Sequence, residues 1–261
     1  MLKRETGTKG MRNIIAILNQ KGGVGKTTTT INLAAYLAKM GRSVLVVDLD
    51  PQGNATSGFG LQKNNEVTTY DVLINGALVG QAIKDVDVEG ISIIPANAEL
   101  AAAEIELVSR EDREQLLKTA LAHTSHDYVL IDCPPSLGLL SINALVAADW
   151  VLIPVQAEYY ALEGLTQLLS TVQRVRQGLN PNLELLGVAV TMFDGRTSLS
   201  DSVYKELQKH FGPKLFKTVI PRNVRLAEAP SHGKTILEHD KWSRGARAYK
   251  ALAKEIDKDV S

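Results

Sequence analysis

Residues 19–28, NQKGGVGKTT, have the types and spacing of a loop that binds phosphate groups. The loop follows a short apolar run and precedes a segment with helical spacing, a position in which glycines let backbone N–H groups converge on an anion. Lys26 is expected to reach the β- and γ-phosphates of a nucleotide, and the Thr27 hydroxyl to hold Mg²⁺. The residues expected to bind the nucleotide here are Gly22, Gly23, Val24, Gly25, Lys26, Thr27 and Thr28.

This loop departs from the ordinary G-x-x-x-x-G-K-[ST] pattern. Gln20 stands where that pattern has its first glycine, and Lys21 adds a second cation five residues before Lys26. Two cations are not easily buried side by side in one loop, so Lys21 should either point to solvent or meet additional negative charge. An exposed loop lysine is the plain alternative to a functional one.

Two apolar runs end in carboxylates that could serve a cation-dependent phosphoryl site. Residues 44–47 are followed by Asp48 and Asp50, and we expect one of the two to face the site. Asp50 is the better candidate for orienting an attacking water, with a turn-capping aspartate as the alternative. Asp132 follows the apolar run 128–131, as in a Walker B strand, and is expected to hold the metal or its water shell. The expected metal-binding set is therefore Thr27, Asp50 and Asp132.

A parallel sheet is needed to bring these residues together. The chain alternates β-branched runs with segments of helical spacing, which predicts βαβ units in a single α/β domain. The expected strands are Ile14–Leu18, Ser43–Val47, Ile91–Ile94, Tyr128–Ile131, Val151–Val155, Leu185–Val190 and Lys217–Ile220. The expected helices are Lys26–Met40, Ala98–Val108, Arg113–His123, Leu139–Ala147, Ala161–Gln177, Ser200–Phe211 and Arg244–Asp257. We expect a three-layer fold of the P-loop NTPase type, with a mainly parallel twisted sheet of about seven to eight strands and helices on both faces. Its ligand should bind at the carboxyl ends of the strands.

Composition excludes several classes of protein. The 261 residues are 44% apolar and 22% charged, which suits a packed interior. A single cysteine, Cys133, rules out an internal disulfide or a Cys-rich metal site within one chain. The apolar runs are shorter than the ~20 residues that cross a bilayer, and residues 1–11 lack the apolar core of a secretion signal. We expect a cytoplasmic protein, with a flexible tail at 1–11 and one domain at 12–261.

The charges, which cancel over the whole chain, are distributed unevenly. Between Arg196 and Lys250 there are 12 basic residues and 5 acidic ones. Such a cluster could bind the phosphate backbone of duplex DNA without reading sequence, although charge runs are more often solvated faces. On charge alone, Lys205, Lys209 and Arg247 are candidate contacts.

Several blocks resemble the ParA/Soj family. KGGVGKT is similar to the deviant Walker A motif, KGGxGK[ST], of the ParA/MinD group of P-loop ATPases. The further blocks that resemble the family are VDLDPQGNAT, IDCPPSLGLL, PVQAEYYALEGL, VTMFDGRT and PRNVRLAEAPSHGKTI, and together they extend from residue 14 to about residue 250.

The resemblance implies a Mg²⁺-dependent ATPase that hydrolyses ATP slowly on its own. ATP-loaded monomers would form a homodimer in which Lys21 crosses to the partner's nucleotide, so that Lys21, Lys26 and Asp50 are the expected catalytic residues. The dimer would bind duplex DNA without sequence preference on the nucleoid, and a ParB-type centromere-binding protein would stimulate hydrolysis during chromosome or plasmid partitioning. The resemblance also assigns Pro221, Arg222 and Asn223 to the adenine, and Arg196 and Arg225 to DNA.

Three other functions share the phosphate loop. A MinD-like ATPase that cycles on membranes would need a terminal amphipathic helix with bulky apolar residues, which the mixed charges of 249–261 do not favour. An iron protein would need several thiolates around a cluster, and this chain has one cysteine. A nucleotide-sensing adaptor without turnover would share every binding residue and differ only in whether Asp50 acts.

Overall fold

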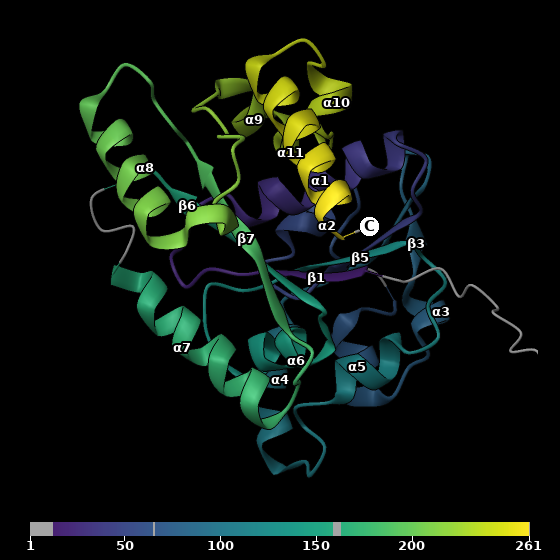
Figure 1. The fold of residues 1–261 in the computed structure, drawn as a ribbon. Coiled ribbons are helices and arrows are strands. Elements are labelled where there is room, and N and C mark those ends of the chain that lie inside the picture. The colour runs from purple at the N-terminus through teal and green to yellow at the C-terminus, as the bar shows by residue number, and fades with distance from the viewer. Residues whose placement is uncertain (1–12, 65, 159–162, 261) are drawn as a thin grey trace, which may run out of the picture.

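One sheet, built from segments far apart in the sequence, forms the middle layer of the molecule (Figure 1). The structure is a computed structural model that describes residues 13–64, 66–158 and 163–260, so the expected tail at 1–11 lies outside the described residues. The seven strands lie in the order β3-β4-β2-β5-β1-β6-β7, and every neighbouring pair is parallel except β3 with β4. The strands are β1 (Asn13–Ile17), β2 (Val44–Asp48), β3 (Lys84–Asp85), β4 (Ile91–Ile94), β5 (Tyr128–Asp132), β6 (Trp150–Gln156) and β7 (Glu184–Thr191).

Helices cover both faces of this sheet, as the alternating pattern predicts. In Figure 1, α1, α2 and α11 lie above the sheet and α4, α5, α6 and α7 lie below it. The helices are α1 (Lys26–Lys39), α2 (Asn54–Gly58), α3 (Val79–Ala82), α4 (Leu100–Glu106), α5 (Leu116–Leu121), α6 (Leu139–Ala147), α7 (Glu163–Gly178), α8 (Ser198–Phe211), α9 (Val224–Glu228), α10 (Ile236–His239) and α11 (Arg244–Val260). The expected helix start at Ala161 falls outside the described residues.

The core divides into two clusters, one on each face of the sheet. Alternate residues of β1 belong to opposite clusters: Ile15 and Ile17 pack with α1 and α11, while Ile14 and Ala16 pack with α6 and α7. A strand that is buried on both faces has a continuous run of apolar residues, and for this reason the sequence predicts β1, β2 and β5.

The prediction of a strand at Lys217–Ile220 is wrong. Isolated bridges flank this segment, Val188 with Leu215 and Phe193 with Pro221, and within it Ile220 N donates to Val190 O at 2.8 Å without forming a strand. The reason is a side chain: the carboxylate of Glu255 on α11 accepts the amide N–H groups of Lys217 and Thr218, both at 3.0 Å. The seventh strand is instead β3, a two-residue antiparallel edge too short to leave a pattern.

Among the described residues, no helix is both long enough and apolar enough to cross a bilayer.

Candidate active site

The loop between β1 and α1 has the backbone geometry of a phosphate cradle. Gly23 and Gly25 have φ angles of 74° and 88°, in the left-handed region that favours glycine. Gly25 is the N-cap of α1 and brings no side chain to the first amides of the helix, which therefore remain available to an anion. The predicted order of strand, glycine loop and helix is confirmed, with α1 beginning at Lys26.

Lys26 lies almost completely buried within this loop. Its Nζ donates a hydrogen bond to the backbone oxygen of Lys21 at 3.2 Å. Burial lowers the pKa of Lys26, while the charges of Asp132 and Asp50 act in the opposite direction. The ammonium is thus desolvated close to two carboxylates. Desolvation strengthens its attraction for a nucleotide phosphate, and the carboxylates offset part of that attraction.

Asp132 is held at the end of β5 by two hydroxyl groups of α1. Thr27 Oγ1 donates to one carboxylate oxygen at 2.7 Å and Thr30 Oγ1 to the other at 3.0 Å. The register of β2 with β5 sets Asp48 directly opposite Asp132. Burial, and then the nearby charge of Asp48, raise the pKa of Asp132. Sequence reasoning missed Thr30; its place one helical turn after Thr27 in the run KTTTT was the available signal.

Asp48 and Asp50 have different surroundings. Asp48 is fully buried, and its carboxylate accepts the N–H and hydroxyl of Thr56 at 2.8 and 2.7 Å. Asp50 retains 7% exposure, and its charge acts on both Lys26 and Asp132. Its Oδ1 also accepts the N–H of Gln52 at 2.9 Å, so the turn-capping alternative describes one of its two oxygens. Asp50 is therefore the one of the pair that borders the phosphate loop.

Hydroxyl and carboxylate oxygens are the ligands that Mg²⁺ prefers. In the part of the chain that the structure describes, no group of three or more His, Cys, Asp or Glu side chains could enclose a metal ion. Mg²⁺ is commonly bound through one or two carboxylates together with phosphate oxygens and water, rather than by a protein cage. The Thr27 hydroxyl beside Asp132, with Asp50 nearby, fits that pattern.

A cavity of about 430 Å³ continues from the phosphate loop. The three residues that the resemblance assigns to adenine, Pro221, Arg222 and Asn223, line it together with Gly25 and Thr28. The Asn223 side chain also caps α9 by accepting the N–H of Leu226 at 3.3 Å. This volume is in the range of small-molecule sites.

Sequence reasoning missed three other residues that line this cavity. Thr191, at the end of β7, donates to the backbone oxygen of Val24 at 2.8 Å and so fixes the phosphate loop to the cavity. Met192 has a φ of 50°, which is uncommon for a residue other than glycine and is often found at binding sites. The Tyr249 hydroxyl lies 3.1 Å from Thr29 Oγ1 and connects α11 to α1. Thr191 and Met192 stand in the block VTMFDGRT, which was the available signal for them, whereas Tyr249 lies outside the quoted blocks and reaches the site only through the tertiary fold.

Lys21 meets negative charge within its own chain. Its Nζ lies 2.6 Å from Glu158 Oε2, and the two side chains remain 47% and 45% exposed. Gln156 Nε2 donates to the other oxygen of Glu158 at 2.5 Å. Lys21 is thus neither buried beside Lys26 nor left to solvent, but held in an ion pair at the rim of the loop.

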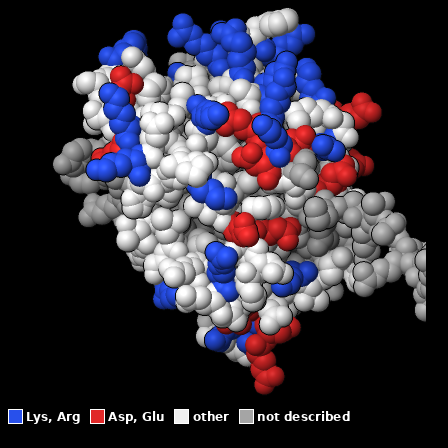
Figure 2. Space-filling model, in the orientation of Figure 1, with Lys and Arg blue, Asp and Glu red and all other residues white. Residues whose placement is uncertain are grey.

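The predicted DNA contacts lie on exposed surface of the C-terminal part of the chain. Figure 2 shows Lys and Arg side chains gathering over the region of α8–α11, with carboxylates among them. Arg196 pairs with Asp194 at 2.7 Å and lowers its pKa, and Arg225 pairs with Glu228 at 2.9 Å. The other exposed candidates are Lys205, Lys209 and Arg247. Arg196 precedes α8, and its loop is joined to that of Arg222 by the bond from Arg222 N to Phe193 O at 3.0 Å.

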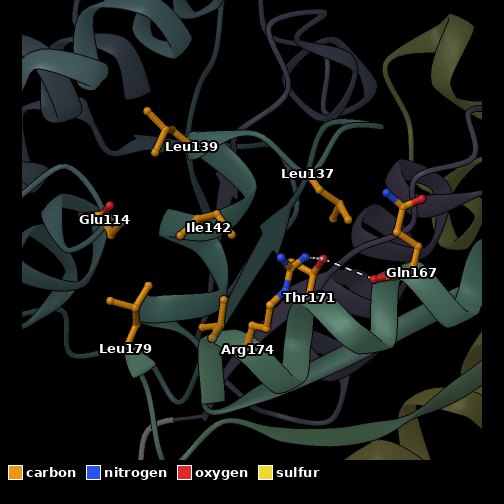
Figure 3. A pocket seen from close by; sticks show the side chains of 9 residues that line it. Glu114, Leu137, Leu139, Ile142, Gln167, Thr171, Arg174 and Leu179 are labelled. Carbon is orange, nitrogen blue, oxygen red and sulfur yellow. Dashed lines mark hydrogen bonds between the residues drawn. The ribbon is translucent and has the colours of Figure 1, made fainter. Parts of the chain in front are cut away.

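Two further features carry no comparable chemistry. A cavity of about 470 Å³ lies between α6 and α7 (Figure 3), and its lining is mostly apolar, with the Arg174 guanidinium donating to Thr171 Oγ1 at 3.2 Å. Cys133 is buried, and burial raises the pKa of its thiol. A thiol kept protonated in this way is a small core residue rather than a cluster ligand.

Known proteins are similar to this chain in sequence and in fold. The family profile described as AAA domain matches residues 12–185. The chain is 58% identical to the sporulation initiation inhibitor protein Soj of Bacillus subtilis, over 94% of this chain and 98% of the relative. It is 55% identical to the chromosome-partitioning ATPase Soj of Thermus thermophilus, over 93% and 94%. A crystal structure of cobyrinic acid a,c-diamide synthase from Mycobacterium smegmatis with bound ATP analogue and magnesium superposes with a TM-score of 0.82 at 39% identity, covering 94% of this chain and 93% of that one. With sequence blocks, fold and phosphate site in agreement, the chain belongs to the ParA/Soj family of P-loop ATPases.

Proposed function

We propose that this protein is an ATP-dependent switch for chromosome or plasmid partitioning. It is a Mg²⁺-dependent ATPase, in which ATP-loaded copies form a homodimer, the dimer binds duplex DNA without sequence preference, and a ParB-type partner stimulates hydrolysis and release. The observation that carries the proposal is the continuous site at the carboxyl ends of β1, β2 and β5. There Lys26, Asp132 and Asp50 adjoin a cavity sized for a nucleoside.

The chain's own groups have separate tasks in this ATPase. The loop amides and Lys26 bind the phosphates, and the cavity lined by Pro221, Arg222 and Asn223 takes the base. Thr27 and Asp132 would hold Mg²⁺, which supplies positive charge to the phosphate oxygens when bound. Asp50 orients the attacking water, since phosphoryl transfer depends mainly on positioning and charge stabilisation.

The surroundings of Lys21 support a requirement for two copies. A lysine paired with one half-exposed carboxylate is weakly held, because such ion pairs contribute only about 0–1 kcal/mol. The phosphates of a second copy's nucleotide offer several negative charges in a less solvated junction, where attraction is stronger. We therefore assign Lys21 to the nucleotide of the partner, which makes hydrolysis depend on dimerisation.

The cationic surface over α8–α11 supports binding to the nucleoid. Exposed Lys and Arg side chains attract phosphate backbone without reading sequence, and each neutralised phosphate releases counterions. A dimer presents two such surfaces, so ATP-driven dimerisation raises DNA affinity by avidity.

The last helix argues against a membrane cycle. Its bulky apolar residues, Tyr249, Leu252 and Ile256, are buried against the core. An amphipathic helix that anchors a protein to lipid must present such residues outward.

Retention on duplex DNA with ATP, ADP or no nucleotide, measured over a salt series, tests this function. We expect retention with ATP alone and a steep decrease as salt rises. Lys26→Ala should remove retention under all conditions, because the variant cannot load ATP. Equal retention in all three nucleotide states would refute the switch, and ATP-dependent binding to anionic vesicles instead of DNA would indicate a membrane cycler.

A further inference from the structure

We propose that Trp242 is an apolar contact to duplex DNA, and this proposal rests on the DNA binding proposed above. Trp242 lies in the turn between α10 and α11 and is 77% exposed. Tryptophan carries one of the largest apolar surfaces of any side chain and is usually mostly buried. Its exposure here leaves a large aromatic face without cover from the rest of the described chain.

The turn that carries Trp242 is held in place by hydrogen bonds. Asp240 Oδ1 accepts the N–H of Trp242 at 3.2 Å, and Asp240 O accepts the N–H of Ser243 at the same distance. Arg225 on α9 also lies 3.8 Å from Asp240 Oδ2. The ring is therefore presented by an ordered turn rather than by a free loop.

One cation lies beside this ring, and further cations follow it in the sequence. Lys241 Nζ lies 5.4 Å from the ring centroid, within the range of a cation–π contact. Residues 241–250 contain four Lys or Arg side chains, all exposed, and no Asp or Glu. A partner that meets this turn must offer negative charge and a flat or apolar surface together.

Duplex DNA offers both. Its phosphates match the cations, and its sugar edges and base steps accept apolar side chains, which architectural proteins press against or between bases. A membrane surface also attracts Trp beside cations, but stable interfacial binding uses a wide apolar face, and the bulky residues of α11 are buried. The observations therefore favour DNA.

Two substitutions separate the apolar contact from the ionic ones. Trp242→Ala should weaken retention of labelled duplex DNA about tenfold while leaving the salt dependence unchanged, because no cation is lost. Lys241→Ala, the matched control, should reduce the slope of log affinity against log salt by about one instead. If Trp242→Ala binds DNA as tightly as the wild type, the proposal is wrong.

The chain supplies its own probe, because Trp150 and Trp242 are its only tryptophans. Trp150→Phe leaves Trp242 as the sole source of tryptophan emission. In that variant with ATP, duplex DNA should quench the emission and protect it from acrylamide, whereas the Trp242→Phe variant should show no change. Trp150 is half-buried at the start of β6, and affinities measured with Trp242→Ala in the otherwise native chain provide a test that does not depend on Trp150→Phe.

The outcomes distinguish a failure of the Trp242 contact from a failure of the proposed DNA-binding function. If the wild type retains no DNA in any nucleotide state, the proposed function fails and this inference with it. If DNA is retained but Trp242 emission is unaffected, only this inference fails. If ATP changes the Trp242 emission before DNA is added and DNA causes no further change, Trp242 lies between the two copies. If anionic vesicles change the emission and DNA does not, Trp242 contacts lipid. Either result overturns the DNA contact.

Discussion

Replacing Glu158 by glutamine is expected to tighten the ATP-dependent dimer about tenfold. The substitution removes the negative charge that lies 2.6 Å from Lys21 in the single chain. Half-exposed ion pairs contribute about 0.2–1 kcal/mol each, and a dimer in which both copies of Lys21 cross the junction must break two of them. At about 0.7 kcal/mol for each pair, the dimer gains about 1.4 kcal/mol, which corresponds to a factor of ten in the dissociation constant.

Sedimentation equilibrium with a non-hydrolysable ATP analogue measures this constant directly. The gain should diminish as salt screens the ion pair. Glu114→Gln is the matched control, because it removes the carboxylate that pairs with Arg113 at 2.9 Å and should leave the constant unchanged. An unchanged constant for Glu158→Gln would show that Lys21 does not leave its own chain. A weaker dimer would show that Glu158 itself contacts the partner.

Three further substitutions test the site itself. Lys26→Ala should abolish nucleotide binding in a fluorescent-ATP titration, because it removes the buried ammonium of the phosphate loop. Near-native affinity would exclude Lys26 from the phosphates. Asp50→Ala should bind ATP, dimerise and retain DNA but hydrolyse ATP at least about a hundredfold more slowly. Unchanged turnover in a phosphate-release assay would show that Asp50 does not orient the attacking water. Gly22→Val should keep ATP binding, because beyond the adjoining residues no atom lies within 4 Å of a Cβ placed at Gly22. The valine should prevent dimerisation, because it crowds the junction beside Lys21. Dimers in sedimentation with ATP would contradict this expectation.

Local signals in the sequence predicted the phosphate loop and the buried strands. Glycines that adopt positive φ, at Gly23 and Gly25, stand beside a lysine and a threonine at fixed spacing, so one short segment specifies both the backbone and its ligand. Strands such as β1 and β5 are recognisable because burial on both faces requires unbroken apolar runs.

Features that depend on distant contacts could not be read in this way. The expected strand at Lys217–Ile220 has suitable residues, but Glu255 on another element binds its amides. The pairing of Lys21 with Glu158 joins residues 137 positions apart, and the sequence indicated only that Lys21 should either point to solvent or meet additional negative charge. The walls that Thr191 and Tyr249 give to the nucleoside cavity likewise come from strand and helix packing.

The place of Tyr249 on α11 has a consequence for how the protein is made. The phosphate loop is translated before the rest of the site, whereas one wall of its cavity, and the bond from that wall to Thr29, come from the later helix α11. Domains emerge from the ribosome N-terminal end first, so a nascent chain has its glycine loop long before it has a complete pocket. A chain that lacks α11 therefore lacks one wall of the cavity, and we expect it to bind nucleotide more weakly than a chain that contains this helix.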